Sequence, residues 1–243
     1  MSHTGLKRLL LGAALLGGTW AALQRPALQR ADVRAGDALR RFGTPALDRA
    51  VTGTTDMGSI YGVVGTAAVL AAAGRRDAAE DALAVGATAW ALAQTNKRFV
   101  RRQRPYEADG VRRLIRPPTG SSFPSGHAAV GVAMLSRLAE RGHGGGSQAT
   151  LTGLGAYVAA SRVYVGVHYP SDVFGGAGLG LMISGLWRGP VAAAGRALIR
   201  LSLRAARALT GPLRRFSALV LLDFRLRGRA SAASAASEER PAA

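Results

Sequence analysis

The distribution of apolar residues constrains the fold of this chain more than any other sequence feature. Six runs nearly free of charge alternate with polar connectors, at residues 9–23, 57–73, 82–96, 127–139, 149–161 and 173–187. Each is shorter than the roughly 20 residues that comfortably span a bilayer, so length alone also permits the buried helices of a soluble bundle. The runs are apolar on all faces, however, and small residues recur closely, as from Gly175 to Gly180. We therefore expect an all-α fold, an integral membrane helical bundle of about six helices.

The charges between these runs indicate the kind of partner. A net charge of +18 and a pI near 11.7 would ordinarily suggest nucleic acid. Because the basic residues are gathered between apolar runs, they favour anionic membrane lipid and phosphate instead, and no nucleic acid is expected. The chain has no cysteine and can form no disulfide. Nothing in the sequence indicates an oligomeric state.

The first 56 residues allow two interpretations. Lys7 and Arg8 precede the uncharged run 9–23, which fits either a signal peptide or a first membrane helix. A persuasive cleavage site is absent, so we favour a retained helix. Residues 24–56 are interpreted as a solvated connector, with a short amphipathic helix around residues 33–42 as the alternative.

Residues 161–172, SRVYVGVHYPSD, combine three side chains suited to chemistry at phosphorus. Arg162 precedes His168 by six residues, and Asp172 follows it by four. A carboxylate can hold one tautomer of an imidazole, and a guanidinium binds phosphate oxygens. The pattern indicates a nucleophilic histidine, although a structural His–Asp pair is the commoner explanation when the stretch is taken alone.

Two upstream stretches are also suited to anion binding. Residues 121–129, SSFPSGHAA, place a turn before His127 and a new apolar run, whose first amides have no intrahelical partners. Residues 97–105, KRFVRRQRP, place Lys97 and Arg104 at the end of another run. A solvated basic loop would explain one such stretch, but it explains three in order poorly.

The ordered set K-x6-R-P, P-S-G-H and S-R-x5-H-x3-D resembles the three-part signature of the type 2 phosphatidic acid phosphatase family. That family shares its fold and site with vanadium-dependent haloperoxidases. The motifs cover residues 97–172, and the spacing of the apolar runs extends the resemblance over about residues 57–187. Every motif position is present. Each element alone would occur by chance, whereas the ordered set seldom would.

The resemblance implies a role for each matching residue. His168 would be the nucleophile that forms a phosphohistidine, Asp172 would orient it, and His127 would be the general acid and then the general base. The phosphate oxygens would be bound by Lys97, Arg104, Arg162, Ser125 and Gly126. Phosphoryl transfer needs mainly positioning and compensation of negative charge, which cationic side chains can supply. No metal site and no cofactor are therefore expected.

The motifs also predict a topology. An even number of helices places both termini on one side and all three motif loops on the other, so the active site lies at one membrane face. Lysines and arginines are divided almost equally between the sides, and the positive-inside rule does not decide the orientation. We expect a multi-pass cell membrane protein with its site on the extracytoplasmic face, as the resemblance implies.

The remaining segments complete the expected organisation. An N-terminal helix or signal segment plus connector covers residues 1–56, and a phosphatase core covers 57–188. A basic amphipathic segment follows at 189–229, in which one helical face would contact anionic membrane through Arg196, Arg200, Arg204 and Arg207. Residues 230–243 are low in complexity and expected to be disordered.

Together these features favour a metal-independent membrane phosphatase that hydrolyses a lipid phosphate through a phosphohistidine. The substrate would be phosphatidate-like or a polyprenyl mono- or diphosphate, and the sequence does not name the lipid. A vanadate-dependent haloperoxidase and a non-catalytic basic protein that binds anionic lipid are the alternatives.

Overall fold

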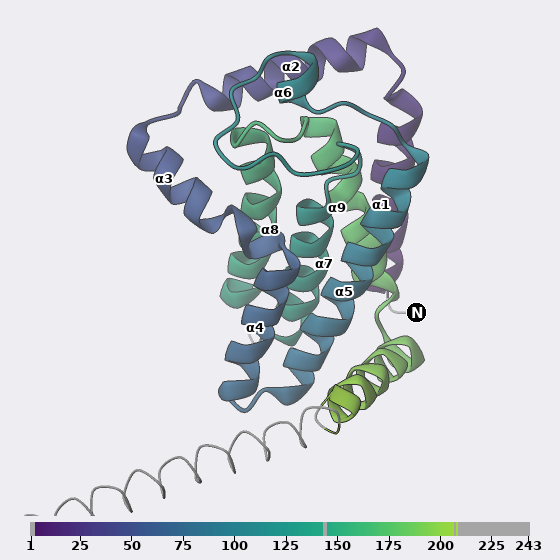
Figure 1. Cartoon of the computed structure of the whole chain (residues 1–243). Helices are drawn as coiled ribbons and strands as arrows, with labels where there is room; N and C mark the ends of the chain where they lie inside the picture. The colour runs from purple at the N-terminus through teal and green to yellow at the C-terminus, as the bar shows by residue number, and fades with distance from the viewer. Residues whose placement is uncertain (1–2, 143–144, 207, 209–243) are drawn as a thin grey trace, which may run out of the picture. The chain divides into compact units, whose positions relative to one another are not determined.

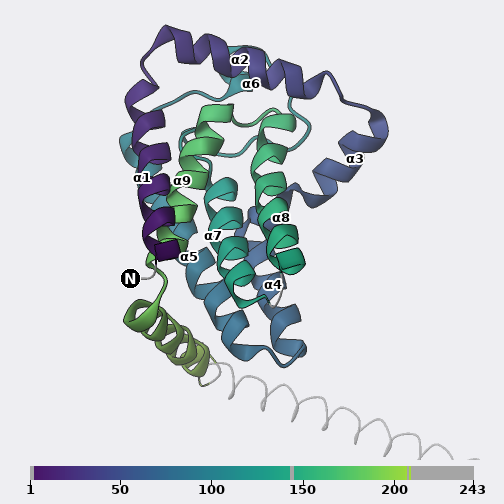
Figure 2. The same cartoon turned by 180° about the vertical axis from the view of Figure 1, so that it is seen from behind.

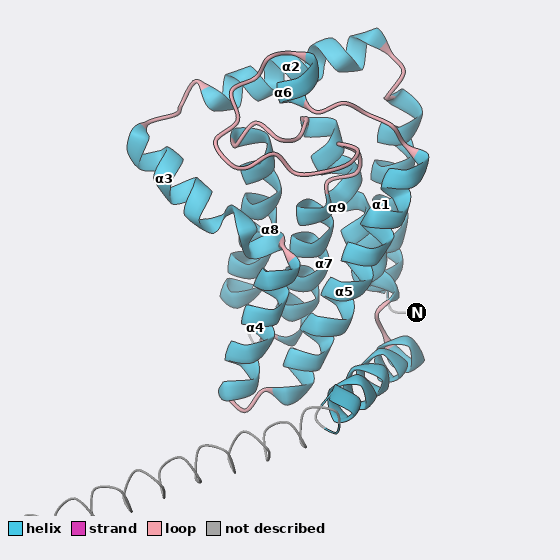
Figure 3. Cartoon of the chain, viewed as in Figure 1, coloured by secondary structure: helices cyan, strands magenta, loops and turns pink. Residues whose placement is uncertain are grey.

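The computed structural model describes residues 3–142, 145–206 and 208. Contacts divide the chain into two compact units, residues 1–197 and 198–243. The first unit contains all the predicted site residues, and its described residues form helices joined by loops, with no strand among them (Figure 3). Its helices are α1 (His3–Ala22), α2 (Pro26–Arg40), α3 (Pro45–Thr54), η1 (Thr55–Gly58), α4 (Ile60–Ala72), α5 (Arg76–Phe99), α6 (Pro105–Ala108), α7 (Gly126–Arg141), α8 (Gly145–Tyr164) and α9 (Pro170–Leu186).

Six of these helices correspond to the six apolar runs. Helix α7 is central and packs against α5, α8 and α9, while α1 packs against α9 and α4 against α5 (Figures 1 and 2). The arrangement agrees with the predicted all-α bundle. The structure adds α2, α3 and α6, which the apolar pattern alone did not indicate.

Glycines allow the closest helix contacts. A Cβ atom on Gly12 of α1 would lie 2.5 Å from the carbonyl oxygen of Gly178 on α9, and one on Gly180 would lie 2.6 Å from that of Ala129 on α7. Real Cβ atoms do not approach an oxygen so closely, so these backbones can meet only where a side chain is absent. Part of the small-residue stretch 175–180 therefore holds α9 against both α1 and α7.

The interpretation of residues 24–56 as a solvated connector was wrong, because most of this segment is helical. Pro26 and Pro45 occupy first-turn positions, where the missing amide proton costs nothing, and the Thr44 side chain caps α3 by accepting from the amide of Leu47 at 3.1 Å. Helix α2 crosses the end of the bundle at which the motif loops lie (Figure 1). It buries Asp32, whose side chain contacts the predicted site region.

Among the described residues, no single helix combines the length and apolar character needed to cross a bilayer. Two bent pairs do so jointly: α1 with α2, at 111°, and the α3–η1 segment with α4, at 78°.

The basic segment differs in one respect from its prediction. Residues 189–206 are helical, but Arg196 is paired with Asp81, at 3.0 Å, and does not belong to a free basic face. Arg207 and the predicted disordered tail at 230–243 lie outside the described residues.

Candidate active site

The three motif segments come together at one end of the bundle. The segment after α5, the start of α7 and the turn between α8 and α9 all lie at the end crossed by α2 and α6 (Figures 1 and 3). Backbone hydrogen bonds join them directly, since the Ser125 amide donates to the carbonyl of Asp172, at 2.9 Å, and the Ser122 amide to that of Arg102. The convergence expected from the sequence is therefore present.

His168 lies in the turn between α8 and α9 and is only 2 % exposed. Its Nδ1 is 3.5 Å from Oδ2 of Asp172, and its Nε2 is 3.3 Å from a guanidinium nitrogen of Arg104. A carboxylate beside Nδ1 favours the tautomer that carries its proton there, so Nε2 is the acceptor in the contact with Arg104. Burial lowers the pKa of His168 to about 3, aided by the charges of Arg104 and Arg162 and opposed by Asp172. The imidazole of His168 is therefore neutral at physiological pH.

Asp172 is fully buried at the start of α9, and its carboxylate accepts several hydrogen bonds. Its Oδ2 accepts from the Tyr169 amide at 2.8 Å and from the Ser122 hydroxyl at 2.5 Å. The first of these bonds belongs to a capping box, in which the third residue of a helix reaches back to the residue before its start. Local helix chemistry, with Pro170 at the first position, thus fixes the carboxylate next to His168.

Two buried arginines bring positive charge to the site, and within the described residues neither forms an ion pair with a buried carboxylate. Arg104 is 0 % exposed and binds mainly neutral acceptors, including the carbonyl oxygens of Val167 at 2.9 Å and Gly120 at 3.2 Å. Arg162 is 1 % exposed and donates to the Thr55 hydroxyl at 2.8 Å, and its buried Nε has no hydrogen-bond partner among the described residues. Such groups attract an anion that can complete their hydrogen bonds.

The N-terminus of α7 carries three further predicted residues. Ser125 caps the helix, with its hydroxyl accepting from the Ala128 amide at 3.4 Å. At Gly126 an added Cβ would make an ordinary van der Waals contact with the Cβ of Ala93, at 3.8 Å, so packing alone does not require glycine here. His127 places Nε2 at 3.2 Å from Oδ1 of Asp56, and both side chains reach solvent.

Lys97 lies half-buried in the last turn of α5. It is close enough to Arg104, Arg162 and Asp172 for charge interactions. Within the described part of the chain, its ammonium group has no hydrogen-bond or ion-pair partner. Its position is consistent with the expected contact to an anion.

Sequence reasoning missed several residues that contact the predicted ones. Arg102 and Ser122 bind Asp172, whereas Thr55 and Asp56 lie beside Arg162 and His127. Ser122 and Arg102 stood inside the stretches already selected, so buried polar contacts could have been suspected there. Nothing in the sequence around η1 marked Thr55 or Asp56.

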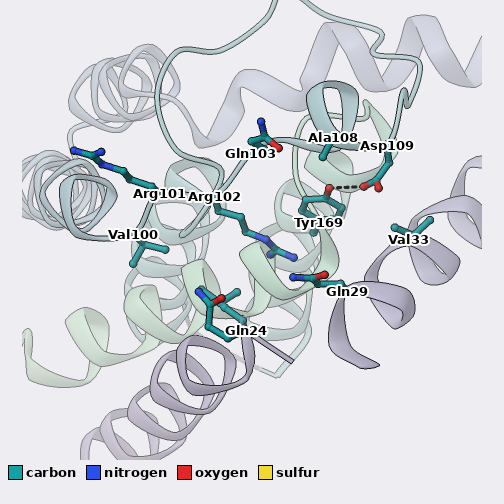
Figure 4. Close-up of a pocket in the computed structure, with 11 residues that line it drawn as sticks. Gln24, Gln29, Val33, Val100, Arg101, Arg102, Gln103, Ala108, Asp109 and Tyr169 are labelled. Atoms are coloured by element: carbon teal, nitrogen blue, oxygen red, sulfur yellow. Dashed lines mark hydrogen bonds between the residues drawn. The ribbon is translucent and has the colours of Figure 1, made fainter. Parts of the chain in front are cut away.

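A cavity with polar and apolar lining residues lies beside this site, and none of the predicted residues lines it. It has a volume of about 460 Å³ and is lined by residues of the segment 100–109, by Gln24 and Gln29, and by Tyr169 (Figure 4). Arg102 forms part of its wall, and the Tyr169 hydroxyl donates to Asp109 across it.

Comparison with known sequences finds the family model described as the PAP2 superfamily, matched by residues 81–193. Among curated proteins, a decaprenylphosphoryl-5-phosphoribose phosphatase of Mycolicibacterium smegmatis is 41 % identical over 97 residues, or 39 % of this chain and 51 % of that protein. Its Mycobacterium tuberculosis counterpart is 38 % identical over 98 residues, or 40 % and 52 %. The matched region therefore spans about half the length of these relatives.

Two solved structures are similar over most of their length. The transmembrane PAP2-type phosphatidylglycerolphosphate phosphatase of Bacillus subtilis matches with a TM-score of 0.64 at 25 % identity, covering 76 % of this chain and 94 % of that one. Aquifex aeolicus LpxE matches with a TM-score of 0.57 at 25 % identity, covering 65 % and 95 %.

Proposed function

Residues 81–193 of this chain belong to the PAP2 superfamily, and from that premise we propose that the chain is a membrane phosphatase acting on a lipid phosphate. The family recognised in the sequence motifs is thereby confirmed, and so is the all-α class of bundle. The observation that most supports the activity is the buried pair of His168 and Asp172 beside two arginines, Arg104 and Arg162, that have no ion pair with a buried carboxylate in the described part of the chain.

In the proposed first step, Nε2 of His168 attacks phosphorus and the bond to the leaving alcohol breaks. The new P–N bond gives a phosphohistidine, and His127 transfers its proton to the departing alkoxide oxygen. Asp172 holds the Nδ1 proton and stabilises the positive charge that develops on the ring. Asp56, 3.2 Å from Nε2 of His127, orients the acid.

In the second step His127 takes a proton from water as the water oxygen attacks phosphorus. The P–N bond breaks, inorganic phosphate leaves, and both histidines return to their starting states. The equatorial oxygens would be bound by Lys97, Arg104, Arg162, the Ser125 hydroxyl and the Gly126 amide. Because these groups supply positive charge and amide donors, we propose that no metal ion takes part.

The proposed substrate class is a phosphate ester of a membrane lipid. Support comes from the mycobacterial relatives, whose name gives a decaprenylphosphoryl-5-phosphoribose as substrate, and from the structural neighbour named as a phosphatidylglycerolphosphate phosphatase. Both substrates join a phosphate to an apolar anchor. Phosphatidate-like lipids and polyprenyl mono- or diphosphates therefore remain the candidates.

We further propose that the bundle is an integral membrane protein of the cell membrane with its site facing outward. The organisation into residues 1–56, a core at 57–188, a basic segment at 189–229 and a tail belongs to this proposal. The basic segment would contact anionic lipid. Release from membranes by alkaline carbonate without detergent would contradict the integral assignment.

The activity is tested by phosphate release from detergent-purified protein in the presence of EDTA. The panel comprises phosphatidate, lysophosphatidate, phosphatidylglycerol phosphate, a polyprenylphosphoryl-5-phosphoribose, and polyprenyl phosphates and diphosphates. We expect turnover of at least one lipid, inhibition by vanadate, and none with His168→Gln. Activity that EDTA abolishes and magnesium restores would contradict the metal-free mechanism.

A further inference from the structure

Asp172 is held by a residue outside the family signature. Arg102 donates from Nη1 to Oδ1 of Asp172, at 2.6 Å, and from Nη2 to Oδ2 of Asp32, also at 2.6 Å. We propose that Arg102 and Asp32 are positioning residues for the nucleophile, acting on His168 through Asp172. This inference rests on the proposed phosphatase function.

The geometry around Arg102 leaves it little freedom. Nη1 also donates to the Ser171 hydroxyl, at 2.7 Å, and the guanidinium carbon lies 4.1 Å from the centroid of the Tyr169 ring. A planar guanidinium can bridge two carboxylates and stack on an aromatic ring at once, which an ammonium group cannot do. The guanidinium is thereby fixed in one orientation.

Asp32 extends this arrangement to α2. Its side chain is 2 % exposed, and its Oδ1 and Oδ2 accept from the amide and hydroxyl of Ser171, at 2.9 and 2.5 Å. Ser171 lies in the first turn of α9, next to Asp172. One carboxylate from α2 therefore anchors both Arg102 and the start of the helix that carries the orienting carboxylate.

The two carboxylate oxygens of Asp172 have different partners. Oδ1 binds Arg102, whereas Oδ2 faces Nδ1 of His168 and accepts from Ser122 and the Tyr169 amide. A contact on Oδ1 therefore fixes the plane of the carboxylate and the direction of Oδ2. Arg102 also compensates the charge of a carboxylate with no solvent exposure, and the charges of Asp172 and Asp32 keep the pKa of Arg102 above its usual value despite burial.

Removal of Arg102 should thus impair the orientation of His168 more than substrate binding. Arg102→Ala should lower kcat about 10²-fold, the cost of misplacing a reacting group by about 1 Å, with KM changed less than threefold. Asp32→Asn should lower kcat about 10-fold, because Arg102 would keep its contact to Asp172 but lose half of its anchor. Matched controls are Gln103→Ala and Gln29→Ala, which line the same cavity (Figure 4) and should stay within twofold of the parent protein.

The cavity permits a test that a purely structural role would not pass. Arg102 forms part of its wall (Figure 4), so a guanidinium ion can enter the space left by Arg102→Ala. Millimolar guanidinium chloride should restore kcat of Arg102→Ala at least tenfold, while the two control variants and His168→Gln gain nothing. Melting temperatures measured alongside show whether each variant is folded.

Three results would overturn the inference: a kcat for Arg102→Ala within twofold of the parent, a folded Arg102→Ala that guanidinium does not restore, or Asp32→Asn with only KM altered. If Arg102→Ala does not fold, the Asp32→Asn result decides. An inactive parent protein under all lipids would instead contradict the proposed function itself, and the positioning role with it.

Discussion

Arginine clusters occur at both ends of the bundle, but the two clusters differ in how their charges are compensated. At the end remote from the motifs, Asp81 is fully buried and is bound by Arg137, Arg141 and Arg196, at 2.7 to 3.0 Å. Glu140 is bound there by Arg8, at 2.5 Å, and also by Arg137 and Arg188. At the motif end, Arg104 and Arg162 bind carbonyl oxygens, a hydroxyl and an imidazole, with the exposed Asp56 at 3.7 Å from Arg162.

We propose that this difference separates arginines that stabilise the fold from arginines that bind the phosphate of the substrate. An arginine paired with a buried carboxylate is already compensated, and its loss leaves a buried charge unpaired. An arginine held by neutral acceptors keeps its charge available to an incoming phosphate. Arg102 is the exception at the motif end, since it is paired with two carboxylates, and we accordingly give it a positioning role.

The largest expected effect concerns the leaving group at the motif end. His127→Ala should lower the rate on an alkyl phosphate by about 10²–10⁴-fold, the usual range for loss of a general acid. On an aryl phosphate, whose leaving group departs without protonation, most of that loss in the first step should disappear. Rates of alcohol and phenol release measure both. Equal losses on the two substrates would contradict the acid role.

The next largest effect is expected for Arg162, one of the two arginines that are not paired with a buried carboxylate. Arg162→Ala should lower kcat about 10²–10³-fold, the effect of removing one donor to a developing oxyanion. The melting temperature should change little, because no buried carboxylate loses its partner. Steady-state kinetics on the best lipid and thermal unfolding in detergent give the two numbers. A large loss of stability with normal kcat would show that Arg162 stabilises the fold and does not act on the phosphate.

The remote cluster should give the opposite result. Asp81→Asn should destabilise the bundle by about 2–3 kcal/mol, somewhat less than for a fully buried pair because the partner arginines reach solvent. Its kcat at a temperature where it is folded should match that of the parent. Denaturant unfolding and lipid phosphatase assays check this pair of outcomes. If Asp81→Asn lost kcat but kept the stability of the parent, the proposed difference in role between the two arginine clusters would be wrong.

The smallest effect is on the pH dependence of stability. The pKa of His168 is lowered to about 3 in the folded protein, so the unfolded chain binds a proton that the folded chain does not as the pH falls below about 6.5. Stability should therefore fall with decreasing pH in that window, by at most about 1.4 kcal/mol per pH unit. His168→Gln should have a shallower slope between pH 6 and pH 5. Parallel slopes for the two proteins would refute the assignment.

The sequence predicts those helices that are apolar along their own length, because such a segment is buried whatever its neighbours are. The runs 57–73, 82–96, 127–139, 149–161 and 173–187 each became one helix of the bundle, because apolar residues define them without reference to distant segments. The motif residues could likewise be located, since their spacing places them at helix ends that face one side.

The remainder depends on contacts between residues far apart in the sequence. Asp32 belongs to a polar stretch, and it is buried only because Arg102 and Ser171 lie against it in the folded protein. Arg102 is one of several basic residues between Lys97 and Arg104, and only the fold turns this one towards Asp172. Arg196 fits the basic pattern of its helix, but in the folded protein it forms an ion pair with Asp81, which is far away in the sequence.

The most direct test of the account is to isolate the phosphoenzyme. Aryl phosphate labelled with ³²P would be mixed with the parent protein, His127→Ala and His168→Gln in EDTA and quenched in alkaline detergent, which preserves phosphoramidates. We predict labelled protein that accumulates in His127→Ala, because hydrolysis of the intermediate lacks its base, and no label in His168→Gln. Label that persists in His168→Gln, or phosphate release without label in either active protein, would contradict nucleophilic catalysis by His168.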